Sequence, residues 1–147
     1  YGSISLEKAL ADNRFEEILA LEIEQRLGSP KPTFLYNYPL TFASLARKTQ
    51  ADPDFAERFE IYIGGLELAN GFSELTDAGE QRARFEKENN TRSQRGRPPC
   101  PMPEKFLEAI SRMPESAGIA LGIDRMVMLF ANVASIDDAV SFTPEEL

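Results

Sequence analysis

Histidine is absent from this chain of 147 residues, and Cys100 is its only cysteine. Without histidine the commonest general base and metal ligand is missing, so any chemistry must depend on carboxylates, Arg, Lys and backbone groups. A lone cysteine excludes an internal disulfide framework and predicts a reducing, cytoplasmic compartment. The sequence has neither an apolar run near the roughly 20 residues of a membrane span nor a signal-peptide pattern at its start.

Basic residues are the minority among the charged ones: 16 Lys and Arg stand against 24 Asp and Glu, for a formal net charge of −8. This balance argues against a protein whose main task is wrapping nucleic acid, although it leaves room for a local basic patch. The length fits one domain over 1–147, with a helical segment over 1–30 and a core over 31–147. Because the chain begins with Tyr1 rather than Met, we expect it to be a fragment of a longer protein.

Periodicity and capping residues predict an α+β fold in which helices flank an antiparallel sheet. Apolar spacing predicts a helix over 13–27, capped by Asn13, and a rigid turn over 28–32. Another helix begins after the cap Asp77 and runs to about Asn90. The remaining predictions are strands over 33–38 and 118–123, a loop over 91–103, a helix over 104–112, a helix capped by Asp124, and a short helical tail that ends at Pro144.

The stretch from 58 to 74 predicts a β-hairpin. Gly64-Gly65 stands between two alternating runs, and both positions of such a two-residue turn can require positive φ. This turn would pair Ile63 with Leu66 and give the hairpin an aliphatic face that packs on the core. The other face would carry Glu60, Tyr62 and Glu67.

Glu60 and Glu67 are the first candidate binding residues. Diagonal neighbours on adjacent strands lie roughly 7 Å apart at Cβ, so these two carboxylates could share a divalent ion. An ordinary solvated sheet face explains the pair equally well.

The end of the hairpin adds a second set of candidates. Asn70, Phe72 and Glu74 share a strand face and would offer an amide oxygen, an aromatic wall and a carboxylate to an ammonium group. Strict alternation places Glu67 on the opposite face from these three. A single pocket therefore requires the strand to change phase around 69–71, most simply by a bulge at the glycine.

The stretch 118–125 combines small residues with an arginine. Gly118, Ala120 and Gly122 fall on one strand face, where a flat or polar ligand could lie against the backbone, and the bulky residues of the other face would belong to the core. Arg125 follows at the start of the next helix, where it could meet a phosphate or stack on a base. The alternative is a glycine-rich strand packed tightly on a helix, with Arg125 as a surface charge.

A run of basic residues follows the hairpin: Arg82, Arg84, Lys87, Arg92, Arg95 and Arg97. Glutamates are interspersed, so a solvated helix and loop is the favoured interpretation. A docking surface for an acidic partner is the alternative.

The stretch 118–125 resembles motif 3 of the class II aminoacyl-tRNA synthetases, a small-residue strand followed by an ATP-binding arginine. Residues 58–60, 65–75 and 81–85 resemble the lysyl-tRNA synthetase branch of that family, as do 32–34 and 44–46. The likeness runs from about Lys31 to the end of the chain. It implies part of the class II catalytic fold, an antiparallel sheet flanked by helices, and a homodimer.

The resemblance assigns roles to single positions. Glu60 and Glu67 would hold the Mg²⁺ ions that bind the ATP phosphates. Gly122 and Arg125 would bind ATP, with Arg125 as the catalytic residue. Asn70, Phe72, Glu74 and Ala120 would contact lysine, with Glu74 nearest its amino group. The implied reaction joins lysine and ATP into lysyl-adenylate, promoted mainly by positioning and charge neutralisation.

The chain departs from the family pattern in two ways. Motifs 1 and 2 are not found, so this chain alone should not activate an amino acid. Ala120 stands where the family usually has Gly, as in the paralogous branch that modifies elongation factor P with (R)-β-lysine; residues 95–99 resemble that branch too. One added methyl on the pocket floor would favour the β-isomer.

We therefore expect lysine or β-lysine as substrate and elongation factor P as acceptor. A lysyl-tRNA synthetase that charges tRNA-Lys, and a non-catalytic binding module derived from a synthetase, are the alternatives.

Overall fold

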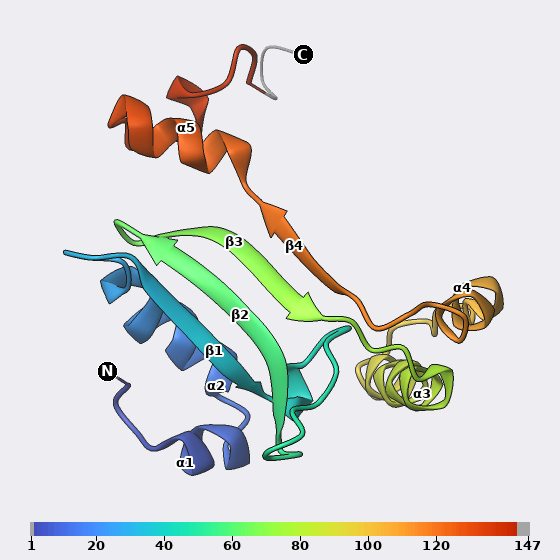
Figure 1. Cartoon of the computed structure of the whole chain (residues 1–147). Coiled ribbons are helices and arrows are strands. Elements are labelled where there is room, and N and C mark those ends of the chain that lie inside the picture. Colours follow the sequence, from blue (N-terminus) through green and yellow to red (C-terminus); the bar gives the residue numbers. More distant parts are fainter. Residues whose placement is uncertain (1, 144–147) are drawn as a thin grey trace. The chain divides into compact units, whose positions relative to one another are not determined.

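The structure, a computed structural model, describes residues 2–143. Its four strands form one antiparallel sheet in the order β1-β2-β3-β4 (Figure 1), which confirms the predicted α+β class. The helices and strands are α1 (Leu6–Ala11), α2 (Phe15–Ile18), β1 (Thr33–Pro39), β2 (Phe55–Ile63), β3 (Leu66–Ser73), α3 (Ala78–Gln94), α4 (Glu104–Ile110), β4 (Ala117–Leu121) and α5 (Ile123–Ala131). No helix within the described residues is both long and apolar enough to cross a membrane.

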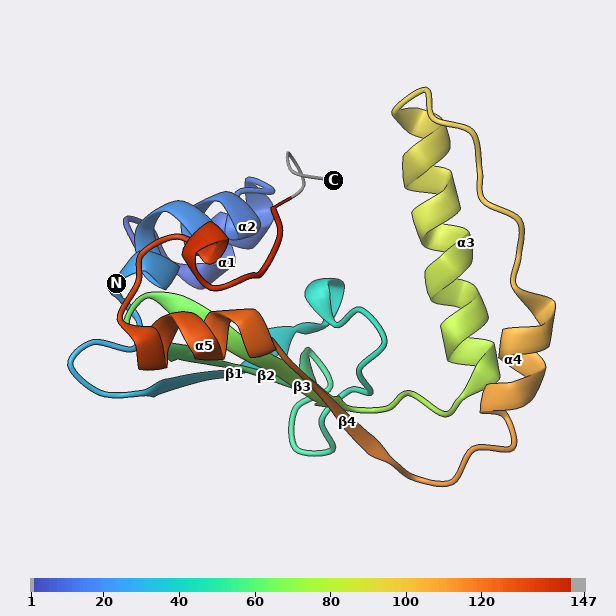
Figure 2. The same ribbon diagram turned by 90° about the horizontal axis from the view of Figure 1, so that it is seen from above.

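The chain divides into two compact units. The first unit contains residues up to 36, 59–71 and those from 119 onward, and the second contains 37–58 and 72–118. In the first unit, α1 and α2 lie on one face of the strands, as Figures 1 and 2 both show. In the second unit, a small buried cluster of Ala43, Ala46 and Ala56 has Leu40 and Phe72 packed against it.

The predicted hairpin is confirmed, with β2 and β3 joined by Gly64 (φ 60°) and Gly65 (φ 81°). The prediction of which face is buried was wrong. Glu60 and Tyr62 are only 5% and 1% exposed, whereas Ile61 and its neighbours on the other face are half-buried. Alternation defines two faces of a strand, but which face is covered depends on the helical segment that packs there.

The helix predicted over 13–27 exists, but its start differs from the prediction. The helix begins at Phe15, and Asn13 does not cap it, because Asn13 has φ 54° and the cap position is held by Arg14. Asn13 instead takes up the left-handed turn that follows α1, which lies in the predicted helical segment over 1–30 but was not predicted as a separate helix. After Ile18 the hydrogen-bond pattern changes to a π-helix (Leu19–Ile23) and then to a 3₁₀-helix (Glu24–Arg26).

Helix α3 begins as predicted, since Asp77 Oδ1 accepts a hydrogen bond of 2.9 Å from the backbone N–H of Glu80. The helix continues to Gln94, so the loop begins at Arg95, four residues after its predicted start at Thr91. The predicted helix over 104–112 is α4 and ends slightly earlier, at Ile110.

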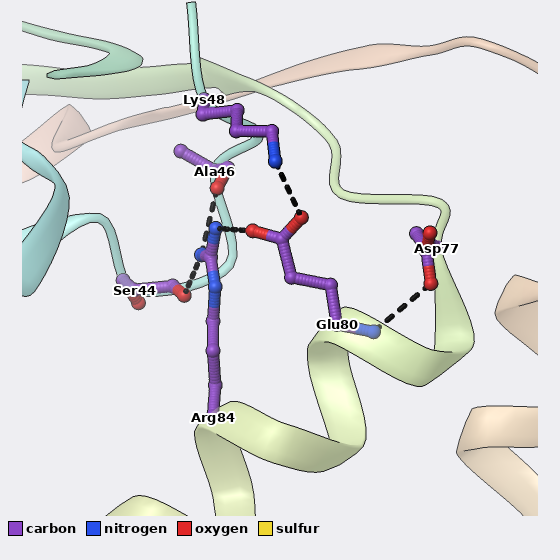
Figure 3. A network of polar contacts seen from close by, with 6 residues as sticks. All are labelled: Ser44, Ala46, Lys48, Asp77, Glu80 and Arg84. Atoms are coloured by element: carbon purple, nitrogen blue, oxygen red, sulfur yellow. Dashed lines mark hydrogen bonds and ion pairs between the residues drawn. The ribbon is translucent and has the colours of Figure 1, made fainter. Parts of the chain in front are cut away.

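The first turns of α3 are tied to the segment 44–48 by Arg84 (Figure 3). Its Nη1 donates to the carbonyl oxygens of Ser44 and Ala46 at 2.9 and 2.8 Å, and its Nη2 donates to Glu80 Oε1 at 2.6 Å. Lys48 Nζ lies 3.7 Å from the other oxygen of the same carboxylate. Arg84 therefore has a structural role, as do the residues around it.

Strand β4 and helix α5 follow the prediction in position but not in burial. Ile119, Leu121 and Ile123 are 64%, 47% and 56% exposed, so the prediction that this bulky face belongs to the core was wrong for this chain. The cap of α5 is Gly122 rather than Asp124, which lies inside the first turn. A 3₁₀-turn over Ile136–Asp138 represents the helical tail, and its predicted end at Pro144 lies outside the described residues.

Candidate active site

Five of the eight predicted site residues line one cavity of about 330 Å³ in the first unit. It forms where β3 lies beside β4 and α5 begins, a junction fixed by the Gly122 N–H, which donates to Leu68 O at 2.8 Å. The five residues are Glu67, Asn70, Ala120, Gly122 and Arg125. The fold thus brings together groups that are 58 residues apart in the sequence.

Arg125 projects from the first turn of α5 and is anchored on β3. Its Nη1 donates to the backbone oxygen of Glu67 at 2.7 Å and lies 3.5 Å from Glu67 Oε2. The side chain is still 47% exposed, and a guanidinium has five N–H donors. Arg125 is therefore held in a fixed direction and keeps donors for an anionic ligand in the cavity.

Glu60 is a buried carboxylate whose two oxygens both accept hydrogen bonds. The Tyr62 hydroxyl donates to Oε2 at 2.7 Å, and Asn70 Nδ2 donates to Oε1 at 3.2 Å. A buried carboxylate is costly unless it is paired in this way. These bonds hold Glu60 beside Asn70, one of the residues that line the cavity.

The bond from Asn70 to Glu60 shows that β3 changes phase. With Ile63 opposite Leu66 across the two-residue turn, strict alternation would place Asn70 on the face opposite to Glu60. The hydrogen bond requires both side chains on the same face, and the consecutive burial of Leu68 and Ala69 shows the same break in alternation. The predicted phase change is therefore present, but it lies between Glu67 and Asn70, so the bulge predicted at Gly71 was placed too late in the strand.

Glu24 interacts with Tyr62, Glu60 and Glu67, and it is not among the site residues predicted from the sequence. Burial raises the pKa of the Glu24 carboxyl, and the nearby charges of Glu60 and Glu67 raise this pKa further, while a hydrogen bond with Tyr62 lowers it. One signal could have identified Glu24: it lies three residues before Leu27, so it shares the apolar face of the predicted helix. A carboxylate on such a face needs a polar partner.

The oxygen atoms around the cavity suit magnesium in their chemistry. Glu60, Glu67 and Asn70 supply carboxylate and amide oxygens, and Asn70 Oδ1 is a buried acceptor with no hydrogen-bond partner among residues 2–143. In the same part of the chain, no group of three or more His, Cys, Asp or Glu is arranged to hold a metal ion. Mg²⁺ is usually held by one or two carboxylates together with substrate phosphates, so the residues fit an ion that arrives with a nucleotide.

Gly118 of β4 and Gly122, the cap of α5, differ in what an added side chain would meet. A Cβ at Gly122 would meet its nearest neighbours at 3.5 Å, an ordinary contact, so packing does not demand glycine there. A Cβ at Gly118 would lie 2.9 Å from Glu74 Oε1, but this atom is the end of a flexible side chain that can move aside at little cost.

Phe72 and Glu74 belong to the second unit. Phe72 is half-buried against its alanine cluster, and the Glu74 N–H donates to Ser116 O at 2.9 Å. The joint action of Asn70, Phe72, Glu74 and Ala120 on one ligand remains a prediction.

Comparison with known proteins identifies the family of the chain. Residues 4–146 match the family model described as tRNA synthetases class II (D, K and N). The chain belongs to this family. The antiparallel sheet and its helices fit part of the catalytic fold of this family.

Curated relatives within the family include three elongation factor P–(R)-β-lysine ligases. The protein of Pectobacterium carotovorum is 43% identical over 145 residues, which is 98% of this chain and 45% of the relative. That of Salmonella gallinarum is 45% identical over 133 residues (90% and 41%), and that of Erwinia tasmaniensis is 43% identical over 143 residues (97% and 44%). The chain spans less than half the length of these relatives.

Proposed function

We propose that this chain forms part of an ATP-dependent ligase that activates (R)-β-lysine as an adenylate and transfers it to elongation factor P. The observation that carries the proposal is the 43–45% identity, over nine-tenths or more of the chain, to ligases with that name. The cavity supports it, because Ala120 lines the cavity beside Arg125 and Asn70.

In the first step, a carboxylate oxygen of β-lysine attacks the α-phosphorus of ATP, the bond to the bridging oxygen breaks, and pyrophosphate leaves. Arg125 of α5 would bind the phosphates with the N–H groups that Glu67 leaves unused, and its hydrogen bond to β3 limits the reorganisation needed. Glu60 and Glu67 would hold Mg²⁺, which neutralises phosphate charge when it is bound. A nucleophilic group of the acceptor then attacks the acyl carbon, and AMP leaves.

The amino acid would lie against β3 and β4. The unpartnered Asn70 Oδ1 is an acceptor for an ammonium group. The family resemblance assigns the compensating negative charge to Glu74. The Ala120 methyl group would occupy the space that an α-amino group needs, and so favour a substrate with its amino group one carbon further away.

The test is ATP–pyrophosphate exchange in the protein at its natural full length, with (S)-α-lysine and (R)-β-lysine as competing substrates. We expect a higher kcat/KM for β-lysine, and we expect Ala120→Gly to move the ratio toward α-lysine by about tenfold. Ala117→Gly is the matched control, because Ala117 is an exposed residue of the same strand that does not line the cavity.

Each result separates the candidate functions. A preference for α-lysine together with charging of tRNA would identify a lysyl-tRNA synthetase and overturn the proposal. Exchange with neither substrate would favour the non-catalytic binding module. If Glu74→Gln left the KM for the amino acid unchanged, the role of Glu74 at the amino group would be wrong.

A further inference from the structure

The C-terminal end of α3 is an ordered cap rather than a loose loop. Gly96 has φ 70°, its N–H donates to Ser93 O at 3.0 Å, and the Arg97 N–H donates to Arg92 O at 2.9 Å. This pair of bonds is the Schellman motif, in which a left-handed glycine closes the helix. The cap fixes the backbone of residues 95–97 on the end of the helix.

The segment after the cap is pinned back along α3. Asn89 Nδ2 donates to Cys100 O at 2.9 Å, and the Cys100 N–H donates to Asn89 Oδ1 at 2.8 Å, so one side chain satisfies both backbone groups. Arg92 Nε also donates to Pro98 O at 3.2 Å. Because prolines stiffen the same segment, its exposed residues are held in place before any partner arrives.

A cavity of about 280 Å³ lies between α3 and this segment, within the second unit. Its apolar walls come from Phe85, Cys100, Pro101, Met102 and Pro103. Arg92, Glu88 and Asn89 supply the polar part of the lining. The size and lining suit one apolar side chain of a partner.

The surface around the cavity carries positive charge that the fold does not neutralise. Between Asn89 and Pro103 the sequence has three arginines and no Asp or Glu, although the whole chain has a net charge of −8. Arg82 is paired with Glu104 and Arg84 with Glu80, but Arg95 and Arg97 make no side-chain ion pair among the described residues. Stabilisation of the helix by arginines near its C-terminus would explain Arg95 and Arg97. It would not explain the apolar cavity beside them.

We infer that this α3-end surface, made of residues 89–103 and Phe85, docks the acceptor protein of the proposed ligase. The matching face of the acceptor presents carboxylates around one apolar side chain, which enters the cavity beside Met102 while the carboxylates meet Arg95 and Arg97. The inference rests on the proposed function, since only a ligase that acts on a protein has such an acceptor. RNA fits this surface less well, because a sugar-phosphate backbone has no apolar side chain to fill the cavity beside Met102.

The experiment compares Arg95→Glu/Arg97→Glu with Arg26→Glu/Lys31→Glu in the full-length protein. All four residues are exposed, and none makes a side-chain ion pair in the described part of the chain, so both variants change the net charge equally without disturbing the core. Exchange of pyrophosphate measures the first step, and transfer of β-lysine to purified elongation factor P measures the second. Met102→Ala tests the cavity, with the half-buried Met113→Ala as its control.

We expect Arg95→Glu/Arg97→Glu to keep pyrophosphate exchange and to raise the KM for elongation factor P by about tenfold or more, with a smaller difference at high salt. Equal KM values in this variant and its control would overturn the docking surface and leave the proposed function standing. If the unaltered protein shows no exchange, the proposed function fails, and direct titration with elongation factor P decides the docking surface instead. If Arg95→Glu/Arg97→Glu weakened the binding of tRNA and left the binding of elongation factor P unchanged, the docking of a protein here would be overturned, and the surface would be assigned to nucleic acid.

Discussion

Gly28 occupies a position where a single methyl group should cost much of the stability of the first unit. Its φ is 79°, and a Cβ there would lie 2.6 Å from the backbone N and Cα of Ile63 and from the carbonyl carbon of Tyr62. Normal contacts between carbon atoms are about 3.5–4.0 Å, so the backbone of β2 would have to move by about 1 Å. The same junction is closed by hydrogen bonds from Gly64 N–H to Gly28 O and from Gly65 N–H to Leu27 O.

The loss expected for Gly28→Ala has three parts. The left-handed conformation costs about 1–2 kcal/mol for any residue with a Cβ. Overpacking against backbone costs about 1–3 kcal/mol, and each hydrogen bond lost at the hairpin turn about 0.5–1.5 kcal/mol. Gly96→Ala is the matched control, because Gly96 has φ 70° and no atom within 4 Å of the added Cβ. The Gly96→Ala variant should lose only the free energy of the left-handed conformation.

Urea unfolding followed by circular dichroism measures both variants. We expect Gly28→Ala to lose about 2–4 kcal/mol more unfolding free energy than Gly96→Ala. Equal losses in the two variants, within about 0.5 kcal/mol, would refute the argument, because they would mean that backbone conformation alone explains the effect. The comparison bears on the site as well, since the 3₁₀-turn that carries Glu24 ends two residues before Gly28.

Three further predictions follow from the polar contacts. Burial raises the pKa of Glu24, so protonation of this carboxyl favours folding at a pH below its ordinary pKa. The contribution is lost as the pH rises through the raised pKa of the folded state. In urea titrations, Glu24→Gln should therefore be more stable than the unaltered protein at pH 7 and equally stable near pH 4. Tyr62→Phe removes the hydroxyl donor from buried Glu60 and should lower the unfolding free energy by about 1–3 kcal/mol; an unchanged urea midpoint would show that Glu60 does not need this donor. Arg84→Met should cost about 2 kcal/mol, since Glu80 and two carbonyl groups lose their donor, and a loss below about 0.5 kcal/mol in thermal unfolding would contradict the structural role of Arg84.

The elements that the sequence predicted well are those with strong local signals. Gly64-Gly65 demanded positive φ, and the structure has it at both positions. Asp77 capped α3 because a short acidic side chain can reach the N–H of Glu80. Local spacing also required a phase change in β3 if Glu67 and Asn70 share one pocket, although the structure has this change before Asn70 rather than at Gly71.

The features that the sequence did not predict depend on contacts between distant segments. Glu24 lies 36 residues before Glu60 in the sequence, and no local pattern relates them. The buried face of the hairpin was predicted from aliphatic content, but the polar face is covered instead, where Tyr62 and Asn70 satisfy the carboxylate of Glu60. Asn13 was read as a cap from its distance to Glu16, whereas the end of the preceding helix determined its conformation.

The exposed apolar stripe of β4 and α5 has a practical consequence for handling the isolated chain. Ile123, Val127 and Phe130 recur at helical spacing on α5, and Phe130 is 86% exposed. The stripe continues along Ile119 and Leu121 of β4, which is an edge strand of the four-stranded sheet. An edge strand with uncovered apolar side chains is a template for association between copies, opposed here only by the net charge of −8. Salt that screens this charge should therefore lower the concentration at which the isolated chain precipitates, and a dye that binds exposed apolar surface should fluoresce with the chain even in its folded state.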